Sequence, residues 1–289
     1  MRNASSVRDP AVAGAFYPAS SVELLQQIEH CYLEARGPGA VPSVRDAPLD
    51  GVVGLILPHA GYAYSGAIAA HGMAALARLG RPERIVILGP NHYGVGPGLA
   101  LPQEGAWWTP LGHAPVDGRL VEGLLKAWPI LSPSSAAHRY EHSMEVMLPF
   151  LIHLLGSSPP FVAIAMADQS LETSLSLGEV LAATVSKGSV LVIASTDLSH
   201  YYPQDIAQEK DGQAIEAIIR GSPQGVNEVV EGQGVNMCGP GPVMALLAYM
   251  GRIGLSKIDL LAHGTSGDAS EDYSRVVGYA ALLLQSKGS

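Results

Sequence analysis

Short runs of wholly apolar residues alternate with segments of helical periodicity along most of the chain. The apolar runs are GVVGLIL, RIVILG, FVAIAM and SVLVIAS, which begin at residues 51, 84, 161 and 189. The helical segments SGAIAAHGMAALARL and SLETSLSLGEVLAATVS each lie between two of these runs. Strands that are apolar at every position are typical of a sheet covered by helices on both faces. The pattern therefore predicts an α/β fold with a mostly parallel central sheet flanked by helices.

The two ends of the chain extend this pattern. Near the start, SSVELLQQIEHCYLEA has helical spacing with Ser20 or Ser21 as its N-cap, and a loop rich in Pro and Gly follows over residues 35–50. The last two apolar runs, KIDLLA and SRVVGYAALLL, have no helix between them. We expect these two runs to pair antiparallel, which makes the sheet mixed. Because there is no internal repeat and no long linker, residues 1–289 are predicted to form a single domain.

Composition and charge narrow the function classes. Hydrophobic residues make up 47% of the 289 residues, which is enough for a deep core, and the formal net charge is -9. The chain has no run of Lys or Arg, which argues against nucleic acid or an anionic membrane as a partner. No apolar stretch approaches the roughly 18 residues of a membrane span. MRNASSVRDP lacks the apolar core of a signal peptide, and two cysteines make no disulfide framework, so we predict a cytoplasmic protein.

Histidines follow several of the predicted strands at matching positions. His59 and His92 come just after the first two apolar runs, Asp197 and His200 come after SVLVIAS, and His263 comes after KIDLLA. In open α/β sheets, ligands bind outside the carboxyl ends of the strands. A single histidine in a loop is usually structural, but four at equivalent positions indicate a common site at one edge of the sheet.

The two cysteines differ in their surroundings. Cys238 stands before a Gly-Pro-Gly-Pro turn that opens an apolar helix. A helix N-terminus stabilises a thiolate, and the glycines allow a bound group to approach the backbone. Cys31 lies within an amphipathic helix without polar company, where a buried structural role is the expected one. We therefore favour a functional role for Cys238 alone.

Two further groups of polar residues stand near predicted helices or strands. Glu141 and His142 precede the apolar segment SMEVMLPFL, where a helix start explains the acidic residue but not the histidine. Ser195, Asp197 and His200 superficially offer a hydrolase triad. The members of a triad normally converge from separate elements, and no Gly-x-Ser-x-Gly elbow surrounds any serine. We therefore disfavour the triad.

Together these motifs resemble the Memo family, the middle partner named in the AmmeMemoRadiSam grouping of microbial proteins. The resemblance rests on AVAGAFYP, PHAGYAYSG, ILGPNH, EHSMEVMLPFL, STDLSHY, CGPGPV and SRVVGYAA, which occur in this order along almost the whole chain. It implies a fold similar to that of the class III extradiol dioxygenases, which hold Fe(II) with two histidines and a carboxylate. In Memo proteins a cysteine takes the position of the carboxylate.

Carried over to this chain, the resemblance makes His59, His92 and Cys238 the metal ligands. It favours Fe(II) as the cofactor, although two histidines and a thiolate also suit Cu or Zn, so the residues alone do not choose the metal. The resemblance also matches His200 to the acid/base histidine of the dioxygenases, with Asp197 beside it to orient the ring.

On this basis we expect a metal-dependent oxidoreductase, with Glu141, His142 and Tyr62 lining its substrate pocket. Because the eukaryotic relative is a signalling scaffold for phosphorylated peptides, the alternative is a non-catalytic adaptor that binds a phosphorylated or anionic ligand. A zinc hydrolase is a third hypothesis. Many relatives have an aromatic residue where His263 stands, which leaves the role of His263 open. The sequence specifies neither the substrate, whether small molecule or peptide, nor the oligomeric state.

Overall fold

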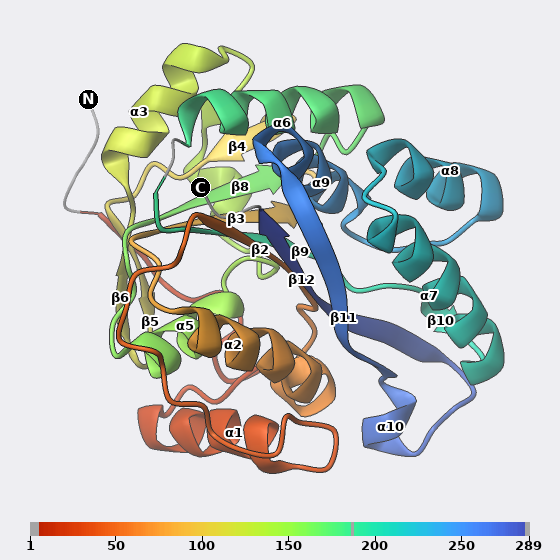
Figure 1. Cartoon of the computed structure of the whole chain (residues 1–289). Coiled ribbons are helices and arrows are strands. Elements are labelled where there is room, and N and C mark those ends of the chain that lie inside the picture. Colours follow the sequence, from red (N-terminus) through yellow and green to blue (C-terminus); the bar gives the residue numbers. More distant parts are fainter. Residues whose placement is uncertain (1–5, 186–187, 287–289) are drawn as a thin grey trace.

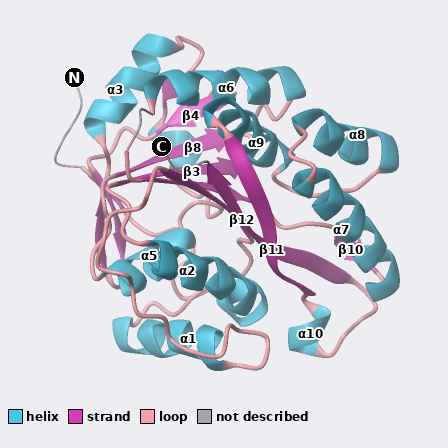
Figure 2. Cartoon of the chain, viewed as in Figure 1, coloured by secondary structure: helices cyan, strands magenta, loops and turns pink. Residues whose placement is uncertain are grey.

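The computed structural model describes residues 6–185 and 188–286 of the chain. The first five residues of MRNASSVRDP, residues 186–187 after a predicted helix, and the last three residues of the predicted domain lie outside the described residues. One large sheet runs through the middle of the described part, with helices on both of its faces (Figures 1 and 2). The predicted α/β class is therefore confirmed.

Four parallel strands form the centre of this sheet, as the apolar runs predict. In order across the sheet they are β2 (Val52–Leu57), β9 (Val190–Ser195), β3 (Arg84–Pro90) and β8 (Phe161–Met166). Antiparallel strands extend it on either side, with β12 (Val276–Ser286) beside β2 and β4 (Leu99–Leu101) beside β8. The pair of β11 (Leu255–Thr265) with β12 confirms the antiparallel pair expected at the end of the chain. The remaining strands are β10 (His200–Tyr202), antiparallel to β12, and β7 (Ser132–Pro133), parallel to β4.

Two hydrophobic cores lie on the two faces of the sheet, because the central strands are buried on both sides. In β3, Ile85 and Ile87 face one core while Val86 and Leu88 face the other. The first core is covered by α1 (Ser21–Leu33), α2 (Ala67–Leu79) and α5 (Met147–Leu155). The second is covered by α3 (Gly118–Ala127), α6 (Leu171–Thr184), α7 (Gln204–Ile219), α8 (Pro223–Gln233) and α9 (Pro240–Ile253). Among the described residues, no helix is long and apolar enough to cross a membrane.

The smallest elements carry too little pattern to be predicted. A separate three-stranded sheet joins β1 (Val7–Arg8), β5 (Ala106–Thr109) and β6 (Gly112–Pro115). Three short helical turns are η1 (Tyr62–Gly66), which is π-helical and runs into α2, α4 (Ser135–His138) and α10 (Gly267–Ser270). Such elements contain too few positions for a hydrophobic period to appear.

The topology brings several loops together at one edge of the main sheet. The parallel strands β2, β9 and β3 are neighbours, and their register pairs Leu57 with Ser195 and Leu88 with Ala194. Because these strands end at the same level, the residues that follow them leave the sheet side by side. This is the edge at which the sequence predicts a functional site.

Candidate metal centre

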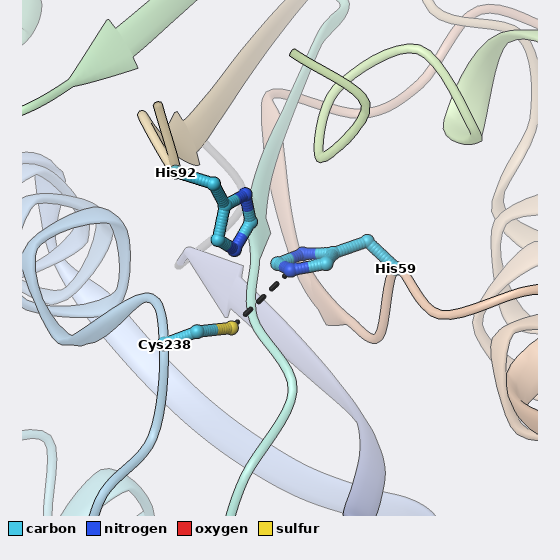
Figure 3. Close-up of side chains that lie close together, drawn as sticks. All are labelled: His59, His92 and Cys238. Carbon is cyan, nitrogen blue, oxygen red and sulfur yellow. Dashed lines mark hydrogen bonds between the residues drawn. The ribbon is translucent and has the colours of Figure 1, made fainter. Parts of the chain in front are cut away.

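Three potential metal ligands converge at this edge from three separate elements. His59 follows β2, His92 follows β3, and Cys238 lies in the loop before α9 (Figure 3). One ligand atom from each of the three lies within 4.8 Å of the other two. The closest approach is 3.2 Å, between the Cys238 Sγ and the His59 Nε2. The structure thus brings together the three residues that the resemblance names as ligands.

The tautomer of His59 follows from its hydrogen bonds. The Ser195 hydroxyl donates its only proton to the carbonyl oxygen of Ser143 at 2.6 Å. The His59 Nδ1 lies 2.7 Å from the same hydroxyl oxygen, so Nδ1 must carry the proton and donate it. The lone pair is therefore on Nε2, which faces Cys238. Burial, and then the neighbouring histidines, hold the pKa of His59 well below its usual range, so the ring is neutral and able to bind a metal.

His92 is oriented in the same way by a buried carboxylate. Glu141 is fully buried, and its Oε1 lies 2.9 Å from the His92 Nδ1, while its Oε2 accepts the His92 backbone N–H at 2.6 Å. Burial alone would raise the pKa of Glu141, but the hydrogen bonds that it accepts from the His92 ring and from the backbone amides of Ser143 and His92 lower it to about 2. An ionised Glu141 accepts the Nδ1 proton and leaves the Nε2 of His92 free. Carboxylates behind ligating histidines serve this purpose in metalloproteins.

The loop that carries Glu141 and His142 is held by the N-terminal segment. The Arg8 Nη2 donates to the Glu141 carbonyl oxygen, and the Arg8 Nη1 forms a 2.7 Å ion pair with the fully buried Glu145. The Glu145 carboxylate also accepts the backbone N–H groups of Ala11 and Val12, and the hydroxyl of Tyr17. A buried ion pair is stable only when its remaining hydrogen bonds are satisfied, as they are here. The motif AVAGAFYP therefore stabilises the loop that carries Glu141 and His142.

Cys238 is held against the end of β9 by backbone contacts. The backbone N–H of Asp197 donates to its Sγ at 3.2 Å, and the Gly239 N–H donates to the Thr196 hydroxyl at 3.0 Å. A Cβ on Gly239 would lie 2.8 Å from that of Thr196, so a side chain there would push the loop away. Burial, and then the charge of Asp197, raise the pKa of the Cys238 thiol. Burial thus outweighs the thiolate-stabilising helix end expected from the sequence, and a bound cation would be needed to favour the thiolate.

His200 and Asp197 lie at the same edge, but they do not form the expected pair. The His200 Nδ1 lies 3.1 Å from the Asn236 carbonyl oxygen, and the Asn236 side chain bonds both backbone polar groups of His200. Asp197 instead accepts the backbone N–H of His59 at 2.7 Å, and burial raises its pKa to about 7. The expectation that Asp197 orients His200 is therefore wrong, because the carboxylate points back toward β2.

A cavity of about 330 Å³ opens in front of these residues. His59, His92, His142, Asp197 and His200 are among the residues that line it. The ring of His142 stacks on that of His92, with the centroids 4.8 Å apart. Of the predicted pocket residues, His142 thus reaches the cavity, while Glu141 lies behind His92.

Tyr62 does not line the cavity as expected. It is buried in the core, and its hydroxyl donates to the Val146 carbonyl oxygen at 2.6 Å. The π-helical turn of η1 directs Tyr62 inward and leaves Tyr64 at the cavity wall with 45% of its surface exposed. A larger cavity of about 790 Å³ borders the first residues of β2, and no His or Cys is among the described residues that line it.

His263 has a partner that the sequence did not indicate. Its Nε2 lies 3.0 Å from the Oδ2 of Asp211, a fully buried residue of α7. The other oxygen of Asp211 accepts the backbone N–H of Ser199 at 2.9 Å. Through Asp211, His263 therefore supports the loop that ends in His200 rather than reaching the cavity itself.

The donor set fits a single metal ion. A four-coordinate ion with bonds of about 2.0–2.3 Å to N and S places its ligand atoms roughly 3–4 Å apart, in keeping with the 3.2 Å separation of Sγ and Nε2. Each imidazole donates through its Nδ1 to a fixed acceptor, so both Nε2 lone pairs are available. Three protein ligands leave further coordination positions for a molecule in the cavity.

Comparison with known proteins shows which family the chain belongs to. A family model described as "Memo-like protein" matches residues 8–283. The chain belongs to the Memo family. MEMO1 family proteins of Methanopyrus kandleri and Ignicoccus hospitalis are each 44% identical to it, over 96% of this chain and 99% and 98% of their own lengths. That of Methanocaldococcus jannaschii is 43% identical over 97% of this chain and its own full length.

A solved structure shows that the fold of this Memo family protein extends beyond close relatives. The crystal structure of an uncharacterized protein from Escherichia coli K12 matches 80% of this chain and 98% of its own, with a TM-score of 0.55. The two sequences are only 17% identical, so the match concerns the fold alone.

Sequence reasoning missed three supporting residues of this Memo site. Ser195 was considered only as a triad nucleophile, whereas it fixes the tautomer of His59. Asn236 lies two residues before Cys238, and that proximity was the only available hint of its contact with His200. Asp211 lies in a part of the chain for which the sequence predicted no element, and it gave no signal.

Proposed function

We propose that this Memo family protein is a metal-dependent oxidoreductase with one iron ion bound by His59, His92 and Cys238. The observation that carries the proposal is the convergence of three donor atoms, two of which are imidazole Nε2 atoms whose lone pairs are left free by the hydrogen bonds at Nδ1. A bound iron ion would supply redox chemistry and Lewis acidity at the floor of the cavity. The substrate is a molecule that binds in the cavity of about 330 Å³ lined by His59 and His92.

In this proposal, the protein residues hold the substrate and move protons. His200 lines the cavity with its Nδ1 tied to a backbone carbonyl, so its Nε2 is free to accept a proton from the substrate. Burial lowers the pKa of His200, which keeps the imidazole neutral and able to act as a base. His142, whose ring stacks on that of His92, also lines the cavity, where it contacts the substrate.

The adaptor hypothesis receives less support from the cavity. A phosphorylated ligand requires positive charge, yet no Lys or Arg is among the described residues that line the cavity. Burial is also the main cause that lowers the pKa values of His59, His142 and His200, so these rings carry little charge at neutral pH. A free Cys238 thiol is required in the proposal, and it fits a reducing cytoplasm.

Metal analysis of protein purified without oxygen tests the proposal. His59→Ala, His92→Ala and Cys238→Ala should each lose bound iron, because two remaining ligands hold an ion weakly. Cys31→Ala is the matched control, since it removes the other thiol of the chain from a fully buried position outside the site. Stoichiometric iron with substrate-dependent oxygen uptake supports the proposal. Zinc without oxygen uptake would favour the hydrolase, and a variant Cys238→Ser that binds iron as tightly as the unmodified protein would refute the ligand set.

A further inference from the structure

Tyr201 stands in an unusual backbone conformation at the mouth of the metal cavity. Its φ is 64°, in the left-handed region that favours glycine. The register of β10 against β12 shifts there, because His200 pairs with Val277 and Tyr202 with Val276. Tyr201 is thus the extra residue of a β-bulge, a position with positive φ that glycine normally occupies.

The fold itself does not account for a tyrosine in this conformation. The ring is 63% exposed, so it contributes little to a core. Glu271 is the other described residue besides glycine with a positive φ, and it ends α10, where a left-handed residue is a common helix stop. Tyr201 ends no helix. A strained residue that packing does not require points to a functional constraint.

The surroundings of Tyr201 form an aromatic wall. Phe16, Tyr64 and Tyr279 line the same cavity, and each comes from a different element. The ring of Tyr201 lies edge-on to that of His200, with the centroids 5.8 Å apart, and the guanidinium of Arg275 lies 5.4 Å from its ring centre. Cation–π contact with Arg275 holds the ring in place at the cavity mouth. No Lys or Arg is among the described residues that line the cavity itself.

We infer that Tyr201 is a ligand-contacting residue that selects metal-binding molecules carrying a flat ring. The inference rests on the proposed metal site, because the selected molecule is anchored on the ion and reaches the cavity mouth. Tyr201 and the neighbouring aromatic residues then stack on the ring. The bulge places the tyrosine at the cavity, which a regular strand residue at this position would not achieve.

Stability measurements separate this role from a structural one. Tyr201→Gly places at φ 64° the residue that prefers this conformation, so the variant should melt at the same temperature as the unmodified protein or higher. Tyr201→Asn, which also tolerates the left-handed region, serves as a second variant in case glycine loosens the loop. A structural role for the tyrosine would instead lower the melting temperature of both.

Two hydroxamates provide the binding probes. Acetohydroxamate and benzohydroxamate chelate a metal through the same group and differ in a methyl or a phenyl substituent. Calorimetric titration of the zinc-loaded protein with each hydroxamate gives its dissociation constant. Because the chelating group is the same, the ratio of the two constants measures the contribution of the phenyl ring. Tyr201→Gly should weaken benzohydroxamate binding by roughly 2- to 10-fold, as expected for one aromatic pair, and leave acetohydroxamate unchanged. Tyr201→Phe should retain the preference, and so should Tyr273→Ala, which removes a 48% exposed tyrosine outside the cavity lining.

The outcomes test the role of Tyr201 separately from the proposed metal site. If the unmodified protein binds no metal, the metal site is refuted and the inference falls with it. If zinc and acetohydroxamate bind normally but Tyr201→Gly leaves the ratio unchanged, the inference alone is overturned. Loss of the preference in Tyr201→Phe would also overturn it, because the hydroxyl and not the ring would then be responsible.

Discussion

The substitution Glu141→Gln tests how the carboxylate behind His92 contributes to metal binding. Glu141 is fully buried and accepts three hydrogen bonds, from the His92 Nδ1, the His92 backbone N–H and the Ser143 backbone N–H. Glutamine has the same shape, but it replaces one carboxylate oxygen by an NH₂ group. Because Oε1 accepts two of the three bonds, the amide oxygen should take that place and leave the NH₂ facing the His92 N–H.

The size of the effect follows from these contacts. One buried N–H loses its acceptor, which should lower the free energy of unfolding by about 1–3 kcal/mol. Loss of the negative charge makes the His92 Nε2 a weaker electron-pair donor to the metal, and changes of this kind reduce metal affinity by about 10- to 100-fold. The corresponding loss in binding free energy is about 1.4–2.8 kcal/mol.

Competition against a chelator of known affinity measures the dissociation constant of zinc or iron, and urea unfolding measures stability. Glu179→Gln is the matched control, because it makes the same change in an exposed ion pair with Arg252, where little effect is expected. The stability loss of Glu141→Gln should shrink as the pH falls from about 4.5 toward 2, since a carboxyl with a lowered pKa contributes stability only above that range. A variant that binds metal as tightly as the unmodified protein would show that the Glu141 charge is not needed.

Three further substitutions test other contacts. Burial lowers the pKa of His138 from 6.5 to about 4, so the unfolded chain binds a proton at a higher pH than the folded protein does. The folded state should therefore lose about 3 kcal/mol of stability as the pH falls from 6.5 to 4. His138→Phe should remove that part of the acid sensitivity, and an unchanged dependence of stability on pH would contradict this reasoning. His200→Ala should keep its metal content while losing oxygen uptake, and loss of metal would make His200 a ligand. Gly278→Ala should cost about 1–3 kcal/mol in urea unfolding, because the new Cβ would overlap the Asp211 carboxylate. Gly212→Ala, whose Cβ would meet no atom within 4 Å, should not be destabilised.

The main sheet was predictable because each central strand is apolar at every position. Burial on both faces leaves a continuous signal in FVAIAM and SVLVIAS, and these runs coincide with β8 and β9 almost residue for residue. The small sheet gave no such signal. Its strand β1 has only two residues, and Arg8 within it is buried between the Glu145 carboxylate and the ring of Trp107. The burial of a charged residue such as Arg8 can be predicted from the sequence only when its distant partner is known.

Tyr62 and Tyr64 show a different limit of sequence reasoning. Both belong to AGYAYSG, two residues apart, and either could face a cavity in an irregular loop. The structure makes this stretch π-helical, with Tyr62 in the core and Tyr64 at the cavity wall. Their directions depend on the local backbone twist, which a sequence without a clear period does not define.

The register of β2 against β9 explains why a histidine stands directly after the buried strand. Leu57 pairs with Ser195, so the residues two positions further along, His59 and Asp197, leave the sheet side by side. Ser195 then accepts a hydrogen bond from the His59 Nδ1 while Asp197 accepts one from the His59 backbone N–H, so both the ring and the backbone of His59 are held. A shift of one residue in this register would turn both acceptors away from His59. The sequence shows that His59 follows β2. Its hydrogen bonds to Ser195 and Asp197 could not be predicted, because they form only when β2 and β9 are paired.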